Sequence, residues 1–253
     1  MGLKFTETHT VSYYECDLTQ TMTVPMLISV VVKTSESQSY RVNKDYPTIV
    51  EDRGLGWVIT HYDIHINRLP KQNERIFVTT EADDYNKFFC YRNFWVHDEE
   101  GNELVKINSI FVLMNLETRH IVSVPKDIVS VYQSQKTTKV RRFDKIPTVT
   151  EPESEQYRVR YFDLDGNGHV NNAKYLNWIL DSLSYDFLIA HRPKRILIRF
   201  DKEVEYGNII TSQWEEHFDN EDDLYSLHRI MLEDTLSAEA KIEWEPIIHV
   251  SED

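Results

Sequence analysis

A short polar segment carries the residue types best suited to chemistry. It reads Asp163-Leu-Asp-Gly-Asn-Gly-His-Val-Asn-Asn172 and is followed at once by an amphipathic run from Ala173 to Ile189. Because alternate side chains of an extended chain share a face, we expect Asp165, Asn167 and His169 to project together. The glycines between them leave room for another group to approach. The segment therefore predicts an acid, an amide and an imidazole gathered at one place.

The amphipathic run predicts a helix whose first turn lies beside these side chains. Asn171 or Asn172 is a suitable N-terminal cap for it. The first backbone N–H groups of a helix carry a partial positive charge, which is suited to a developing oxyanion. Together with the acid and the imidazole, this arrangement indicates attack on a carbonyl group.

Two other interpretations of the segment are weaker. The start of a calcium-binding EF-hand loop has the same pattern, but its bidentate Glu at position 12 is replaced by Lys174. The residues before the segment, Gln156 to Phe162, alternate as in a strand and not as in the entering helix of an EF-hand. A polar turn between strand and helix accounts for the Asp and Asn residues. It gives no reason for His169.

Composition restricts the remaining possibilities. The 253 residues are 41% hydrophobic and 12% aromatic, enough for one large or two ordinary globular domains. Neither a membrane span nor a signal peptide is visible, so we expect a soluble cytoplasmic protein. The two cysteines, Cys16 and Cys90, form no disulfide framework and lack metal-ligand spacing. The net charge of −14 argues against nucleic acid as a partner.

The chain contains an internal repeat. An offset of 146 residues, which places Asp17 on Asp163, also aligns apolar positions that follow. Each half then consists of a strand, a turn, an apolar helix and several long strands. A polar segment from Ser134 to Glu155, which contains two prolines, separates them as a linker. We therefore expect domains at 1–133 and 156–253, each an α+β unit with a sheet wrapped around one helix.

The long strands are predicted from runs of alternating or apolar residues bounded by turn signals such as Asp98 to Asn102 and Asp219 to Asp223. The predicted strands are Trp57 to Leu69, Arg75 to Ala82, Phe88 to His97 and Leu104 to Asn115 in the first half, and Arg195 to Tyr206, Ile209 to Phe218, Leu224 to Glu233 and Ser237 to Trp244 in the second.

The two halves differ at the polar segment. With the offset of 146, the acid, amide and imidazole fall on threonines, Thr19, Thr21 and Thr23. Only the second half is then expected to perform acid–base chemistry. The helix of the first half, from Val24 to about Ser37, is apolar on nearly all sides. Core packing and contact with an apolar ligand both explain that pattern.

The Asp-x-Asn-x-His-Val-Asn-Asn string and the following Tyr175-Leu-Asn-Trp-Ile-Leu-Asp-Ser182 closely resemble acyl-ACP (acyl carrier protein) thioesterases of the plant and bacterial type. Stretches of the first half, Trp57 to Thr60, Ile64 to Arg68 and Val112 to Arg119, resemble the same family, so the resemblance covers nearly the whole chain. It implies a tandem hotdog fold, in which antiparallel sheets wrap long helices.

The resemblance also implies site residues. The family's Asp, Asn and His fall on Asp165, Asn167 and His169, and its further acidic residue falls on Glu203. Many relatives have a cysteine after that acid, and here it is Val204, which cannot attack a thioester. Water activated by a carboxylate is therefore the expected nucleophile. Aligning strands with an offset of 134 places Leu69 on Glu203, so the first half also lacks this acid.

The expected reaction is hydrolysis of fatty acyl-ACP thioesters, which ends fatty acid synthesis. Glu203 or Asp165 would accept a proton from water, while Asn167 and His169 orient water or substrate. No metal or organic cofactor is implied. An acyl-CoA thioesterase and a non-catalytic acyl-binding protein are the alternatives. The sequence leaves chain-length preference and oligomeric state open, a homodimer included.

Two histidines could suggest a metal site. His61 and His65 have the spacing of a helical zinc pair, but they lie in a predicted strand, where four residues span about 13 Å, too far for one metal.

Two further groups of residues are expected to bind the substrate. The resemblance implies that the first half selects acyl length, and its helix offers Leu27, Val30 and Val31 for contact with the acyl chain. Since the protein and acyl carrier proteins are both acidic, docking needs a local basic patch, for which we select Arg192, Lys194 and Arg195.

Overall fold

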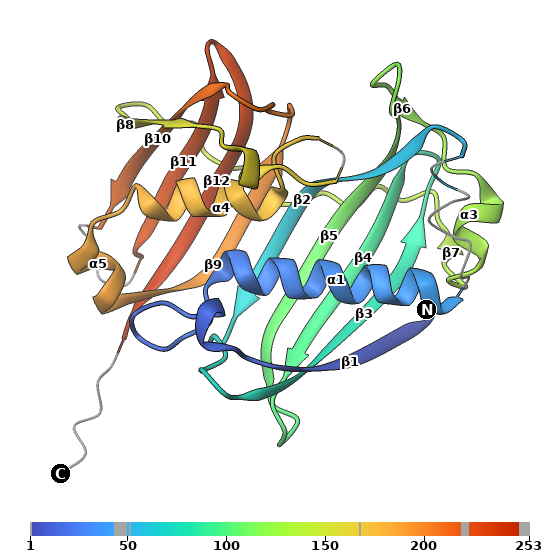
Figure 1. Ribbon diagram of the computed structural model, residues 1–253, viewed down its shortest axis with the longest axis horizontal. Coiled ribbons are helices and arrows are strands. Elements are labelled where there is room, and N and C mark those ends of the chain that lie inside the picture. Colours follow the sequence, from blue (N-terminus) through green and yellow to red (C-terminus); the bar gives the residue numbers. More distant parts are fainter. Residues whose placement is uncertain (1, 43–49, 51, 167, 219–222, 248–253) are drawn as a thin grey trace. The chain divides into compact units, whose positions relative to one another are not determined.

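The computed structural model describes residues 2–42, 50, 52–166, 168–218 and 223–247. The chain divides into two compact units, Met1–Phe143 and Asp144–Asp253, so that the division falls within the segment expected to be a linker. Each unit contains an antiparallel sheet and a helix that packs against it (Figure 1). The α+β character expected from the alternation of strands and helices is therefore present in both units.

The first unit orders its main strands β1-β3-β4-β5-β2. The short strand β6 pairs with β5, and β7 runs parallel to β3. The elements in chain order are β1 (Lys4–Thr10), a 3-10 turn (Tyr13–Glu15), α1 (Val24–Val42), β2 (Leu55–Ile66), β3 (Arg75–Tyr85), β4 (Phe89–His97), β5 (Glu103–Asn115), β6 (Ile121–Val122), α3 (Lys126–Ser130) and β7 (Gln135–Lys136).

The second unit repeats this order as β8-β10-β11-β12-β9. Its helix α4 packs against β10 and β11, as α1 packs against β1 and β3. The elements in chain order are β8 (Glu153–Arg158), a 3-10 turn (Tyr161–Asp163), α4 (Asn172–Asp181), α5 (Tyr185–Ala190), β9 (His191–Phe200), β10 (Ile209–His217), β11 (Tyr225–Leu232) and β12 (Thr235–Pro246).

Helix α1 buries one continuous face. Leu27, Val31, Thr34 and Gln38 follow one another at helical spacing and are all buried, whereas Lys33 is exposed. Along the helix, the buried side chains change from aliphatic to polar. At the polar end, the Gln38 amide donates a hydrogen bond to the backbone carbonyl of Leu3 at 2.6 Å. Burial of the aliphatic part fixes α1 on its sheet.

The sequence placed most long strands to within a few residues, and four elements differ. The strand expected over Gln156 to Phe162 is β8, which ends at Arg158 and gives way to a 3-10 turn. The expected second helix is split into α4 and α5, because the Ser184 hydroxyl accepts the Phe187 N–H at 3.2 Å and starts a new helix. Helix α1 extends to Val42, past the predicted Ser37. Strand β9 runs from His191 to Phe200, whereas the predicted strand ran from Arg195 to Tyr206. The turn at Asp98 to Asn102 is confirmed, and most of the one at Asp219 to Asp223 lies outside the described residues.

Candidate active site

The segment that carries Asp165 and His169 is a tight turn closed by backbone pairing. Leu164 and Val170 form an antiparallel bridge, and inside it the Asp165 N–H donates to the His169 carbonyl at 2.8 Å. The Gly168 N–H donates to the Asp165 carbonyl at 3.1 Å, with Gly168 at φ +81°. The expected extended segment is thus wrong in its geometry. Asp165 and His169 are brought to the same place by closure of the turn, which puts residue 168 in the left-handed region that glycine adopts at little cost.

Asn167 lies outside the described residues. Its assignment to the site therefore stays a prediction from the sequence and the resemblance.

Asp163 anchors this turn, a role that the sequence analysis missed. Its carboxylate accepts the Arg160 backbone N–H at 2.8 Å and pairs with the Arg160 guanidinium at 2.9 Å, while its carbonyl accepts the Asn171 N–H at 2.9 Å. Burial alone would raise the pKa of Asp163, but its hydrogen bonds with Arg160 outweigh burial and lower it. The spacing Arg-x-x-Asp before a turn was the available signal.

Helix α4 begins directly after the turn. The Asn171 side chain caps it by accepting the Ala173 N–H at 3.0 Å, which confirms one of the two expected caps. The Lys174 N–H donates to the Asn171 carbonyl at 2.8 Å. Two of the first N–H groups of α4 are therefore used within the protein. The helix offers fewer oxyanion donors than the sequence suggested.

Glu203 reaches the turn from a different element than expected. Strand β9 ends at Phe200, so Glu203 lies in the connection to β10 and not on a strand. The connection still follows the turn, because the Val170 N–H donates to the Val204 carbonyl at 3.1 Å and His169 bridges Glu205. As a result, His169 Nε2 lies 3.4 Å from Glu203 Oε2. Their side chains are 21% and 33% exposed, which leaves them accessible to water.

The same turn occurs in the first unit, and its backbone contacts correct the register of the repeat. Cys16 bridges Met22, the Asp17 N–H donates to the Thr21 carbonyl at 2.9 Å, and the Gln20 N–H donates to the Asp17 carbonyl at 3.0 Å. These contacts match those of the second turn with an offset of 148 residues. The predicted offset of 146 is wrong by two residues.

The corrected register changes which site residues have a counterpart in the first unit. Asp165 corresponds to Asp17 and not to Thr19, so one carboxylate is kept; His169 corresponds to Thr21. The offset of 134 between Leu69 and Glu203 is confirmed, because the Met22 N–H donates to the Pro70 carbonyl at 2.8 Å, as Val170 does to Val204. Among the described residues of the site, the imidazole and the glutamate distinguish the second turn from the first.

Asp17 shows what the shared aspartate does in the first unit. Its Oδ1 accepts the Thr19 N–H at 2.8 Å and the Thr19 hydroxyl at 2.6 Å. Such contacts stabilise a turn and require no chemistry.

Both cysteines lie in the first unit. Burial raises the pKa of the Cys90 thiol to about 12, and burial and the nearby charges of Asp17 and Glu15 raise that of Cys16. A thiol with a raised pKa is a poor nucleophile near neutral pH. Val204, which the resemblance places at the cysteine position of many relatives, is fully buried.

The residues expected to contact the acyl chain all lie on α1. Leu27 and Val31 are fully buried, and Val30 is 9% exposed. The structure places them on one helix, and their contact with an acyl chain stays a prediction.

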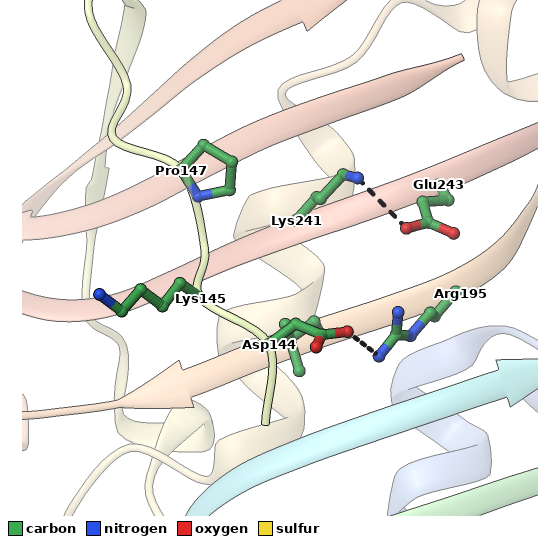
Figure 2. A pocket seen from close by; sticks show the side chains of 7 residues that line it. Asp144, Lys145, Pro147, Arg195, Lys241 and Glu243 are labelled. Atoms are coloured by element: carbon green, nitrogen blue, oxygen red, sulfur yellow. Dashed lines mark hydrogen bonds and ion pairs between the residues drawn. The ribbon is translucent and has the colours of Figure 1, made fainter. Parts of the chain in front are cut away.

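The basic cluster occupies the start of β9, and two of its members are already paired. The Arg192 guanidinium lies 2.7 Å from Glu245, and that of Arg195 lies 2.9 Å from Asp144, whereas Lys194 is exposed. Arg195 also lines a cavity of about 270 Å³. Its other walls come from residues around the start of the unit and from β9 and β12, namely Asp144, Lys145, Pro147, Leu197, Lys241 and Glu243 (Figure 2).

His61 and His65 lie in β2, which confirms the predicted strand. That prediction was the reason for rejecting a zinc site at these two histidines.

Across the described ranges, no helix has both the length and the apolar character needed to cross a membrane.

Comparison with known proteins gives the site its context. The family model of the acyl-ACP thioesterase N-terminal domain matches residues 2–132, and that of the C-terminal domain matches residues 146–246. The chloroplastic acyl-(acyl carrier protein) hydrolase FATB3 of Cuphea viscosissima is 24% identical over 224 residues, which make up 83% of this chain and 54% of that protein. The chain thus spans about half the length of that curated relative.

Solved structures agree with the family models. One from Lactobacillus plantarum, described provisionally as an oleoyl thioesterase, is 33% identical, with a TM-score of 0.91 and 98% of each chain covered. The 12:0-ACP thioesterase from Umbellularia californica is 19% identical and has the same fold, with a TM-score of 0.84 over 98% of this chain and 99% of that one. Because the two family models together match most of its length, the chain belongs to the acyl-ACP thioesterase family.

Proposed function

We propose that the protein hydrolyses fatty acyl thioesters carried on acyl carrier protein and releases the free acid. The observation that carries the proposal is the contact between His169 and Glu203, 3.4 Å apart and partly exposed, in a chain of this family. The fold we propose is a double hotdog, since each unit packs a helix on an antiparallel sheet. The family and the absence of a suitable cysteine in the second unit support water as the nucleophile.

In the proposed mechanism Glu203 acts as the general base. It accepts a proton as a water oxygen bonds to the thioester carbonyl carbon, and the carbonyl oxygen becomes an oxyanion. Collapse of this intermediate breaks the C–S bond and releases the thiolate, which takes up a proton. A thiol of pKa about 8.5 leaves readily, so activation of water is the step that needs most help. His169, beside Glu203, orients water or substrate, and Asn167 shares this role.

Asp165 supports the turn in this proposal. Its counterpart Asp17 bonds the backbone of an equivalent turn that lacks the imidazole and the glutamate. The acyl chain is proposed to lie along α1 near Leu27, Val30 and Val31 in the first unit. A cytoplasmic location stays a prediction, and the curated relative is a chloroplastic protein.

The decisive experiment measures release of free acid from acyl-ACP and acyl-CoA thioesters of graded chain length. The variants His169→Ala and Glu203→Gln should each lose about 10² in turnover or more, the usual value of a positioned acid–base group. The repeat supplies matched controls, because Thr21→Ala and Leu69→Gln alter the corresponding positions of the first unit. These controls should keep near wild-type rates.

The same assay separates the alternatives. Faster release from CoA thioesters than from carrier thioesters at all lengths would identify an acyl-CoA thioesterase. Binding of acyl-ACP without release of acid would identify a non-catalytic acyl-binding protein. Wild-type rates for Glu203→Gln would exclude it as the base.

A further inference from the structure

An exposed aromatic pair precedes the turn that carries His169. Tyr161 and Phe162 are 71% and 85% exposed, and their rings meet edge to face with centroids 5.3 Å apart. With the offset of 148, they correspond to Tyr13 and Tyr14, which are also exposed and form the same kind of pair, with centroids 5.5 Å apart. Both copies of the turn therefore present two large rings to water.

Two arginines distinguish this surface of the second unit from that of the first. Arg158 and Arg160 are exposed just before the aromatic pair, and with the offset of 148 they correspond to Thr10 and Ser12. The Arg158 guanidinium lies over the ring of Tyr206, 5.4 Å from its centroid, and no described carboxylate forms an ion pair with it. The cations thus belong to the unit that has the imidazole and the glutamate.

The face of the sheet on which Arg158 lies has no acidic side chain over the described lengths of β8 and β10. Alternate residues of a strand share a face, and residues paired in register lie on the same face. The face of Arg158 therefore holds uncharged residues of the two strands, namely Ser154, Gln156, Ile209, Thr211 and Gln213. In a chain with a net charge of −14, such a surface is suited to an acidic partner.

This surface lies at the end of the sheet where the site is. Arg158 pairs with Ile209 at the start of β10, directly after the connection that carries Glu203. Tyr206 is three residues after Glu203, so their Cα atoms lie within about 11 Å of each other. Arg192, in the cluster selected from the sequence, is separated from that connection by the length of β9, about 26 Å. A carrier that presents a thioester to Glu203 therefore needs a contact nearer the site.

We propose that Arg158, Tyr161, Phe162 and Tyr206 form a docking surface for the acidic carrier protein beside the site. The proposal rests on the function proposed above, and it adds a surface to the basic cluster at the start of β9. The guanidinium of Arg158 attracts carboxylates of the carrier, and the exposed rings cover apolar surface around the arm that holds the acyl chain.

The test is charge reversal at Arg158. Arg158→Glu should raise KM for acyl-ACP about tenfold and leave kcat unchanged, because the residue contacts the carrier and not the reacting atoms. A small acyl thioester without the protein should keep its KM, and added salt should affect acyl-ACP less than it does with the wild type. Arg160 is not substituted, since its ion pair with the buried Asp163 carboxylate holds the turn.

The first unit supplies matched controls. Arg75 is likewise exposed and lies over an aromatic ring, that of Phe77, at 5.6 Å from its centroid. Arg75→Glu should leave both KM values unchanged. Phe162→Ser and Tyr14→Ser form a second pair, in which only the substitution beside the site should raise KM for acyl-ACP.

A binding measurement does not depend on hydrolysis. In isothermal titration calorimetry, carrier protein that bears the phosphopantetheine arm without an acyl chain should bind Arg158→Glu more weakly than the wild type and Arg75→Glu. No binding by the wild type, or equal binding by all three proteins, would refute the docking surface.

The kinetic results separate the remaining outcomes. An equal rise of KM for acyl-ACP and for the small thioester would place Arg158 in the site and contradict a docking role. A rise for acyl-CoA alone would assign the surface to the phosphates of CoA and not to the carrier. Absence of hydrolysis by the wild type on every thioester would refute the proposed function, whereas the binding measurement would still test the surface.

Discussion

Asp17 and Asp165 occupy the same position in two copies of one turn. The N–H of each donates to the carbonyl four residues later, at 2.9 and 2.8 Å, and the carbonyl of each accepts from the residue three positions later, at 3.0 and 3.1 Å. One copy keeps the histidine and glutamate partners, and the other has Thr21 and Leu69. The protein thus contains its own comparison between a turn that carries the imidazole and the glutamate and an equivalent turn that lacks them.

The first prediction separates turn stabilisation from charge at Asp165. Asp165→Asn keeps an oxygen that can accept backbone N–H groups, so turnover should stay within a few-fold of wild type. Asp165→Ala removes the acceptor and should lower turnover by about 10², since the turn that presents His169 is disrupted. Asp17→Asn and Asp17→Ala are the matched pair in the first unit, and steady-state kinetics measure all four. If Asp165→Asn is as inactive as Asp165→Ala, the negative charge itself takes part in catalysis.

The second prediction concerns the cysteines. Cys16→Ser and Cys90→Ser should keep turnover within a few-fold of wild type, because both thiols have a raised pKa and lie in the first unit. Treatment of the wild type with a thiol alkylating agent should likewise leave a stable activity. An inactive serine variant that is still folded by circular dichroism would contradict the water mechanism.

The third prediction concerns chain length. Enlarging Val30 or Val31 to Phe should move preference toward shorter acyl chains while the rate on the shortest substrate is kept. Each buried methylene adds about 0.8 kcal/mol, so a pocket shortened by two carbons should shift the ratio of kcat/KM values roughly tenfold. Val32→Phe, on the same helix at a half-buried position, is the control. A parallel loss at all lengths would mean that Val30 and Val31 only pack the core.

The fourth prediction concerns docking of the carrier. Arg192→Glu and Lys194→Glu should raise KM for acyl-ACP and spare a small acyl thioester without the protein, and added salt should have the same effect on acyl-ACP. Arg195→Glu also breaks the pair with Asp144, so Asp144→Asn is measured beside it. Arg199→Glu is the control on the same strand, since Arg199 is likewise paired, with Asp201 at 2.7 Å. Equal responses of both substrates would show that the cluster is structural.

The fifth prediction concerns acid stability. His228 is fully buried in the second unit, and burial lowers its pKa from 6.5 to about 3. Above pH 6.5 neither state binds the proton. Below it, the unfolded state binds a proton that the folded state excludes, so the free energy of unfolding should fall by up to about 1.4 kcal/mol per pH unit, until about pH 3.

Denaturant unfolding between pH 7 and pH 4.5 measures this effect. His228→Asn removes the titrating group and should reduce the slope of stability against pH, even if the variant is less stable throughout. His120→Gln, at an exposed position, should keep the wild-type slope. An unchanged slope in His228→Asn would show that other groups cause the loss of stability in acid.

The strands were predictable because each is marked by residue period and by turn residues at its ends. Strand β4, for example, was placed within one residue, since Asn86 and Asp98 begin turns on either side of it. The register of the repeat was not predictable in the same way. The offset of 146 aligned apolar residues of the two halves. The turns are instead equivalent in their backbone hydrogen bonds, and the residue types at Asp17 and Thr21 do not reveal those bonds.

The site was predictable in its residue types and only partly in its geometry. The resemblance selected His169 and Glu203, and the structure brings them to 3.4 Å. The end of β9 at Phe200 was missed, because Asp201 and Lys202 turn their N–H groups to the carbonyl of Ser237 and leave the ladder.

Pro70 has a consequence for attempts to build a second catalytic centre into the same chain. Thr21→His and Leu69→Glu would restore the imidazole and the glutamate on a turn that already has the right backbone contacts. The Pro70 carbonyl already accepts the Met22 N–H at 2.8 Å, so the connection after Leu69 is held against the turn without further substitution. Two substitutions would therefore test whether the imidazole and the glutamate suffice for activity on the turn of the first unit.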